Sequence, residues 1–175
     1  MEKIFKNNAY RILELFIEFP NDNFSIRGIA RHLKISHATV LKYISELEKG
    51  GFIKKNEVTI YPTFFASTQN EKFKFYKKNY LVCKLIDSGI VEYINKESLA
   101  SSIILFGSCA KATFTKDSDI DIFVEANETK LNLLKFEKRL NRKINLIFEP
   151  DINNLSKELR NNIINGVILY GFIRI

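Results

Sequence analysis

Two aspartates separated by a single residue, Asp119 and Asp121, are the side chains whose types and spacing point most directly to chemistry. Side chains two positions apart on a strand share a face, so both carboxylates are expected to point the same way. Paired carboxylates repel each other unless a cation lies between them. Hard oxygen ligands of this kind suit Mg²⁺ or Mn²⁺, with substrate phosphates completing the coordination. The pattern therefore predicts a divalent-cation site at Asp119 and Asp121.

A Gly-Ser pair precedes the two aspartates, with ten residues (109–118) between the pairs. Gly107 has no Cβ, so a triphosphate can approach its backbone closely. Ser108 can donate a hydroxyl, and a helix that begins here offers unpaired backbone N–H groups to phosphate. Lys111 adds a positive charge. These residues predict a binding site for a nucleoside triphosphate, with ATP as the first choice.

The whole segment LFGSCAKATFTKDSDIDIFV, residues 105–124, resembles the signature of the polymerase-β-type nucleotidyltransferase superfamily, in its minimal subgroup. The resemblance extends over about residues 95–175. It implies in-line nucleotidyl transfer assisted by two metal ions, with Asp119 and Asp121 as metal-binding and catalytic residues. Minimal transferases of this kind are often antitoxins that adenylylate a HEPN-type toxin, so the resemblance also implies a toxin-like protein partner as one alternative.

The chain departs from the family pattern at a catalytic position. The superfamily usually has a third carboxylate on the next core strand, where this chain has Asn145. An amide is neutral and cannot act as a general base. Glu149 lies on the same strand face but four residues further on, roughly 13 Å away. The substitution therefore predicts that transfer is impaired or lost.

A second departure lies in the loop after Gly-Ser, where the family usually has Ala-Arg-Gly. Lys111 keeps the positive charge of the arginine but loses its planar fork. Ala112 replaces the glycine, which restricts the loop. Three readings stay open at this point: a nucleotide-binding regulator, an active transferase that modifies a protein or RNA partner, and a degenerate domain that serves only dimerisation.

The N-terminal part of the chain carries most of the positive charge. The net charge of the 175 residues is +7, and residues 1–80 hold 14 Lys and Arg against 8 Asp and Glu. A basic segment of this kind favours a polyanionic partner such as nucleic acid.

The same part shows the element order of a winged helix. Apolar residues at helical spacing, polar N-cap residues and glycine stops predict three helices, at 4–19, 26–33 and 37–49. Two strand-like runs follow, at 52–55 and 58–61, with a turn at Asn56-Glu57. The run FSIRGIARHLKISHATVLKYISELEKGGFIKK (24–55) resembles the helix-turn-helix and wing of MarR- and ArsR-like regulators.

This resemblance implies binding of double-stranded DNA by a transcription regulator. The third helix would be the recognition helix and would present four residues to the major groove: His37, Thr39, Lys42 and Tyr43. Four further cations are expected to contact phosphates: Arg27, Arg31, Lys54 and Lys55. Such readers usually bind paired half-sites, so a homodimer is expected.

The remaining elements complete a two-domain α+β prediction. Residues 1–66 are expected to form the winged helix, 67–100 a helical connector with helices near 70–86 and 90–94, and 101–175 a small α/β nucleotidyltransferase core with a mixed sheet. In that core, strands are expected at 102–106, 119–124 and 143–148, helices at 128–140 and 155–164, and a strand or core tail at 167–173.

Composition narrows the class of protein further. No apolar run reaches the roughly 18 residues that a membrane span needs, and the N-terminus lacks the apolar core of a signal peptide. Cys83 and Cys109 form no CxxC pair, which argues against a disulfide framework or a zinc site. We therefore expect a cytoplasmic protein without a membrane partner.

Overall fold

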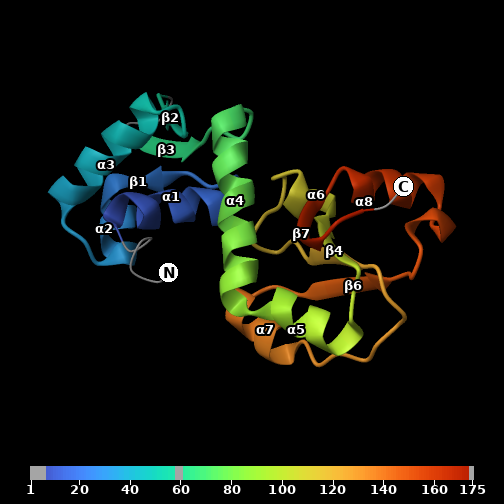
Figure 1. Cartoon of the computed structure of the whole chain (residues 1–175). Coiled ribbons are helices and arrows are strands. Elements are labelled where there is room, and N and C mark those ends of the chain that lie inside the picture. Colours follow the sequence, from blue (N-terminus) through green and yellow to red (C-terminus); the bar gives the residue numbers. More distant parts are fainter. Residues whose placement is uncertain (1–6, 58–60, 174–175) are drawn as a thin grey trace. The chain divides into compact units, whose positions relative to one another are not determined.

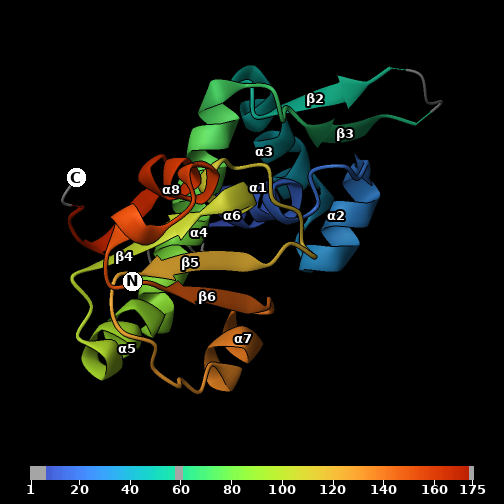
Figure 2. The same cartoon turned by 90° about the vertical axis from the view of Figure 1, so that its right-hand side faces the viewer.

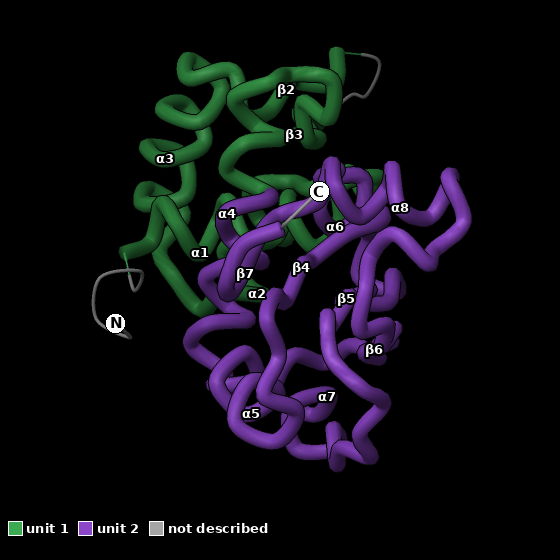
Figure 3. Tube along the Cα trace, turned by 45° about the vertical axis from the view of Figure 1, so that its right-hand side comes forward, with its two compact units in different colours: residues 1–77 green, residues 78–175 purple. Residues whose placement is uncertain are grey.

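The computed structural model describes residues 7–57 and 61–173 (Figure 1). The chain divides into two compact units, residues 1–77 and 78–175 (Figure 3). The residues expected to form a connector contain two helices, α4 (Glu71–Ser88) and α5 (Ile90–Ser98). The division falls within α4, whose first seven residues belong to the first unit.

The first unit has three helices packed beside a small sheet, as the sequence predicts for a winged helix. The helices are α1 (Asn8–Glu18), α2 (Ile26–Leu33) and α3 (His37–Lys49). Each begins where a polar side chain accepts a hydrogen bond from a backbone N–H of the first turn, at Asn7, Ser25 and Ser36. Their buried faces form the core, with Ile12, Phe16, Ile29, Val40 and Ile44 almost fully excluded from solvent.

The wing differs from its prediction in the position of its second strand. The sheet has the order β1-β3-β2, with β1 at Phe24–Ser25, β2 at Ile53–Asn56 and β3 at Thr63–Ala66. The expected turn residue Asn56 lies inside β2 and pairs with Thr63. Residues 58–60 of the expected strand 58–61 lie outside the described residues, and Tyr61 is not in a strand.

The position of β3 follows from what it buries. Phe64 and Ala66 alternate toward the core, and Phe64 also pairs with Phe24 of β1. The strand is therefore fixed by a partner 40 residues earlier in the chain, which local alternation cannot reveal.

The second unit contains a mixed four-stranded sheet of order β6-β5-β4-β7, which confirms the predicted fold class (Figure 2). The strands are β4 (Ser102–Phe106), β5 (Ile120–Val124), β6 (Ile144–Phe148) and β7 (Val167–Gly171). β4 pairs antiparallel with β5 and β7, whereas β5 and β6 run parallel. Both central strands, β4 and β5, are almost completely buried.

Helices cover both faces of this sheet (Figures 1 and 2). α5 and α7 (Leu134–Leu140) lie on one side, where the rings of Tyr93 and Phe136 pack 5.1 Å apart. α8 (Lys157–Ile164) and the short helix η1 (Ile152–Asn154) lie on the other, where Ile152 and Ile163 pack against Ile104 and Phe123. A four-residue helix, α6 (Gly107–Ala110), follows β4 directly.

The helix predicted at 128–140 is wrong in its first half, because helix α7 begins only at Leu134. Asn132 holds the preceding segment in another conformation. Its side-chain oxygen accepts from the N–H of Leu134 at 3.2 Å, and its own N–H donates to the Tyr93 hydroxyl at 3.1 Å. Side chain–backbone bonds of this kind compete with helix formation.

None of the helices in the part of the chain that the structure describes is long and apolar enough to cross a membrane.

Candidate functional site

Three adjoining strands bring the predicted catalytic residues together. Phe106, the last residue of β4, pairs with Asp121 of β5, and Asp121 pairs with Asn145 of β6. Asp119 lies one residue before β5 begins, and Gly107 directly follows β4. The site therefore lies where β4 ends and where β5 and β6 begin.

The Asn145 side chain bridges the two carboxylates. Its Nδ2 donates to Asp121 Oδ1 at 3.0 Å and to Asp119 Oδ2 at 3.3 Å. Both aspartates thus lie on the same side of the strand, as its alternation predicts. The amide N–H₂ group carries a partial positive charge and therefore lowers the repulsion between the two carboxylates. It does so at the place where the carboxylate pair would otherwise attract a cation.

Gly107 approaches the same carboxylate closely. Its φ of +70° lies in the left-handed region, and a Cβ at this position would lie 2.6 Å from Asp121 Oδ2. Any other residue here would be strained and would push the Asp121 side chain away. The glycine is therefore required by the position of Asp121 as well as by its own backbone conformation.

The loop after Gly107 is fixed by its own contacts. The Cys109 thiol is buried and donates to the Asp119 carbonyl oxygen at 3.2 Å, so it holds α6 against the first aspartate. Ser108 is half-buried, and its carbonyl oxygen accepts from the Thr113 N–H at 3.0 Å. Lys111 Nζ donates to the Asn162 side chain of α8 at 3.0 Å. Of the predicted nucleotide-binding residues, Gly107 therefore lies beside the carboxylates, and Lys111 is held by α8.

Ala112 adopts a conformation that alanine rarely adopts. Its φ is +57°, at the position where the family usually has glycine. The left-handed conformation costs roughly 1–2 kcal/mol for a residue with a Cβ. The loop therefore has a glycine-type backbone at a position that this sequence fills with alanine.

Arg142 positions the segment that leads into Asp119, a role that the sequence did not reveal. The side chain is buried, lies over the Phe114 ring at 5.0 Å, and donates to the carbonyl oxygens of Thr115 and Ser118. The Ser118 bond is 3.0 Å long. In the sequence Arg142 is one of several cations before a strand, and only the fold shows which carbonyls it meets.

Glu149 does not reach the carboxylate pair. Its Oε1 accepts from the Asp151 N–H at 3.2 Å and from the Asn154 side chain at 3.0 Å, so it stabilises the turn after β6. Among the described residues there is no cluster of three or more His, Cys, Asp or Glu side chains able to hold a metal ion. The metal ligands that this site offers are therefore the two carboxylates, because Asn145 presents its N–H₂ group to them. That set fits one hard cation whose remaining ligands come from phosphate oxygens.

The predicted recognition helix presents some of its candidate residues to solvent and not others. His37 and Lys42 are exposed, whereas Thr39 and Tyr43 are half-buried. Thr39 Oγ1 lies 2.7 Å from Ser36 Oγ, the oxygen that caps the helix. Lys42 Nζ lies over the Tyr43 ring at 5.4 Å. The exposed candidates are thus concentrated at His37 and Lys42.

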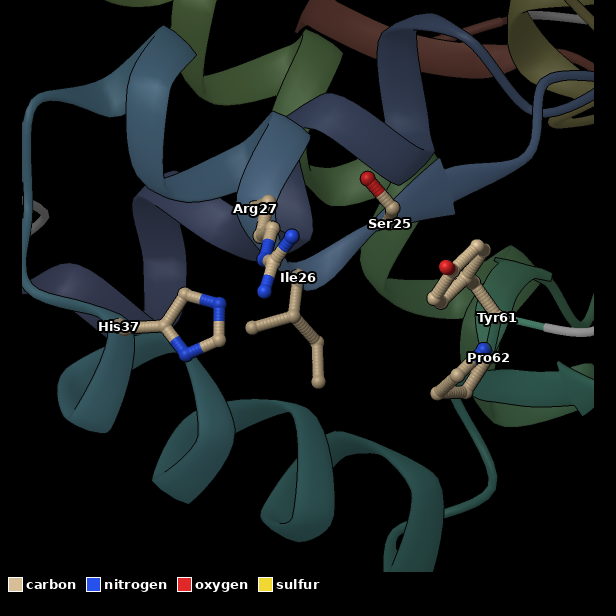
Figure 4. A pocket seen from close by; sticks show the side chains of 6 residues that line it. All are labelled: Ser25, Ile26, Arg27, His37, Tyr61 and Pro62. Carbon is tan, nitrogen blue, oxygen red and sulfur yellow. The ribbon is translucent and has the colours of Figure 1, made fainter.

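A hollow of about 400 Å³ joins this helix to α2 and the wing (Figure 4). Arg27 and His37 point into it from one side, and Tyr61 and Pro62 border it on the other (Figure 4). Arg31, Lys54 and Lys55 are exposed elsewhere in the unit and do not line the hollow. The two wing lysines are successive strand residues, so their side chains leave opposite faces of β2.

Comparison with known proteins gives a family for each part of the chain. Residues 6–54 match the family model of the winged helix-turn-helix DNA-binding domain, and residues 88–172 match that of polymerase beta, nucleotidyltransferase. One solved structure, described as the crystal structure of the toxin-antitoxin with AMP-PNP, is similar to 47% of this chain and 71% of its own, with 26% identity and a TM-score of 0.38. No curated protein matches the chain.

Proposed function

We propose that this protein is a DNA-binding transcription regulator. The chain joins a winged helix-turn-helix DNA-binding domain to a polymerase-beta-type nucleotidyltransferase domain. Its second domain would bind a nucleoside triphosphate together with Mg²⁺ or Mn²⁺ and would transfer nucleotidyl groups weakly or not at all. The observation that carries this proposal is the Asn145 amide between Asp119 and Asp121.

The charge of the site supports cation binding that depends on nucleotide. Two carboxylates and a neutral amide supply less negative charge than three carboxylates would, so they would hold a free cation weakly. Triphosphate oxygens would supply the missing ligands. A bound cation would also neutralise charge on the phosphates. Asn145 would have to release one or both carboxylates before Asp119 and Asp121 could serve as ligands.

The same residue argues against fast transfer. In nucleotidyl transfer an acceptor hydroxyl attacks the α-phosphorus, pyrophosphate leaves, and the hydroxyl proton must pass to a base. Asn145 cannot accept that proton, and Glu149 is held in the turn after β6. Loss of a general base typically slows a reaction by about 10²- to 10⁴-fold.

An active transferase is the second candidate, because the rest of the motif keeps its geometry. Gly107 retains its left-handed backbone beside Asp121, and the Cys109 thiol holds the backbone of Asp119. Such an enzyme would modify a protein or RNA partner. A domain that serves only dimerisation would have no need of this geometry.

Calorimetry with ATP and Mn²⁺ tests the nucleotide-binding proposal. The natural chain should bind ATP in the presence of Mn²⁺ and much more weakly in chelator. Asp121→Asn should abolish the metal-dependent part. Asp117→Asn is the matched control, because Asp117 is an exposed aspartate of the same loop and should leave binding unchanged. Equal ATP binding by the natural chain and Asp121→Asn would overturn the proposal.

A selection of bound fragments from genomic DNA tests the regulator proposal. The full chain should enrich one or a few related sequences. If no sequence were enriched, the winged helix would have no operator, and the proposal that the protein is a transcription regulator would be wrong.

A further inference from the structure

A second hollow, of about 310 Å³, lies at the base of the wing in the first unit. Its lining comes from the cross-strand pair Lys54 and Phe65 and from the turn Ser67–Asn70 that leads into α4. It shares no lining residue with the hollow of Figure 4. Its residues also belong to a different unit from the carboxylate pair.

The Ser67 hydroxyl is the feature of this hollow that calls for a ligand. Ser67 is only 5% exposed, and its Oγ is buried with no hydrogen-bond partner among the described residues. Its backbone N–H, by contrast, donates to the Phe52 carbonyl at 2.9 Å. A buried hydroxyl without a partner destabilises the folded state, because folding breaks its hydrogen bonds to water and forms none in their place. A ligand oxygen in the hollow would supply the missing hydrogen bond.

The charge around the hollow selects an anion. Lys54 is exposed and forms no ion pair within the described residues. The hollow also borders the N-terminus of α4, an 18-residue helix whose dipole is positive at this end. Asn70 Oδ1 already accepts from the N–H groups of Lys72 and Phe73 there, so the helix contributes its dipole and not these two donors. The nearest carboxylate on that helix, Glu71, is already paired with Lys74 at 2.7 Å.

We propose that this hollow binds a phosphate group. The Lys54 ammonium would be its counter-ion, and the Ser67 hydroxyl would donate to one of its oxygens. Thr68, which also lines the hollow, would offer a second hydroxyl donor. Two sources carry this chemistry: a free phosphate monoester such as a nucleotide, and a phosphate of the DNA backbone.

The test is titration of the full chain with inorganic phosphate and then AMP, in chelator, followed by amide NMR shifts. Chelator removes any metal-dependent binding at Asp119 and Asp121, so the result is independent of the function proposed above. Saturable shifts at Ser67, Thr68 and Asn70 are expected. Lys54→Met should weaken phosphate binding by at least about tenfold, since hydrogen bonds to charged groups are the stronger ones.

Two variants separate a built site from general electrostatic attraction. Lys49→Met removes an exposed lysine of the same unit, on α3, that does not line the hollow, and it should leave phosphate affinity unchanged. Ser67→Ala should weaken phosphate binding and also raise the melting temperature of the free protein, because the unpaired hydroxyl is gone. Absence of saturable shifts, or equal losses in Lys54→Met and Lys49→Met, would overturn the proposal.

A short DNA duplex distinguishes the two sources of phosphate. If backbone phosphate occupies the hollow, duplex DNA should shift the Ser67 and Thr68 amides, and inorganic phosphate should compete. If a free monoester is the ligand, duplex DNA should leave both amides unchanged while AMP still shifts them. Either result supports a phosphate site.

Discussion

The side-chain amide of Asn145 donates a hydrogen bond to Asp121 across a parallel strand pair, at 3.0 Å. The same nitrogen reaches Asp119. Because the bond is made by a neutral group, it reduces the repulsion between the two carboxylates without adding the positive charge that a cation would bring. The behaviour of the second domain is expected to follow from this arrangement.

Gly107→Ala should destabilise the protein and abolish metal-dependent nucleotide binding, because the new Cβ meets Asp121 at 2.6 Å. Gly89→Ala is a matched control, since Gly89 has a similar φ of +79° but nothing within 4 Å of the new Cβ. Chemical denaturation should show that Gly107→Ala costs about 1–3 kcal/mol more than Gly89→Ala, the usual range for overpacking. Equal losses would mean that only backbone strain matters at Gly107.

Ala112→Gly should be close to neutral for stability. Glycine relieves the strain of a φ of +57°, but it adds backbone freedom to the unfolded chain by a similar amount. Ala110→Gly is the control, because Ala110 has the same 8% exposure but lies in the short helix α6. That variant should lose about 1 kcal/mol in the same denaturation experiment. If Ala112→Gly lost more unfolding free energy than Ala110→Gly, the conclusion that the Ala112 backbone is strained would be wrong.

Arg142→Lys should weaken nucleotide binding although it keeps the charge. Lysine cannot bridge the carbonyls of Thr115 and Ser118 while covering the Phe114 ring, so the segment before Asp119 loses its anchor. Calorimetry should show the loss with ATP and Mn²⁺. The exposed Arg139→Lys, on helix α7, is the control and should bind normally. Unchanged binding in Arg142→Lys would remove its positioning role.

DNA binding should depend steeply on salt, because lysine and arginine contacts release counterions. Lys54→Ala with Lys55→Ala should weaken binding to all sequences, whereas Lys42→Ala should mainly change sequence preference. Lys49→Ala, at the other end of α3 from His37, is the control for Lys42. Fluorescence anisotropy with operator and random duplexes separates the two effects. A uniform loss in Lys42→Ala would exclude a base-reading role.

The local sequence pattern was sufficient to predict the structure wherever residues close together in the sequence determine it. Strand alternation predicted that Asp119 and Asp121 would share a face, and the family resemblance placed Asn145 beside them. Capping residues predicted where α2 and α3 begin. The pattern failed where a distant partner decides. The position of β3 depends on Phe24, and the late start of helix α7 depends on Asn132 and Tyr93.

Side-chain contacts in the site were harder to foresee for the same reason. Arg142 acts on carbonyl groups 24 and 27 residues earlier, and no spacing in the sequence marks that relation. Thr39 was expected to face DNA, but its hydroxyl is engaged with Ser36. Helical periodicity gives the direction of a side chain but not the partner that it finds.

The rate at which labelled ATP transfers its nucleotidyl group to candidate acceptors, compared between the natural chain and Asn145→Asp, tests the central claim most directly. Aspartate at this position would restore a third carboxylate and a base beside Asp119 and Asp121. The natural chain should transfer slowly or not at all, and Asn145→Asp should be faster by about 10²-fold or more. Transfer by the natural chain at an ordinary enzymatic rate, on the order of 1–10³ per second, would contradict the claim that Asn145 impairs this site.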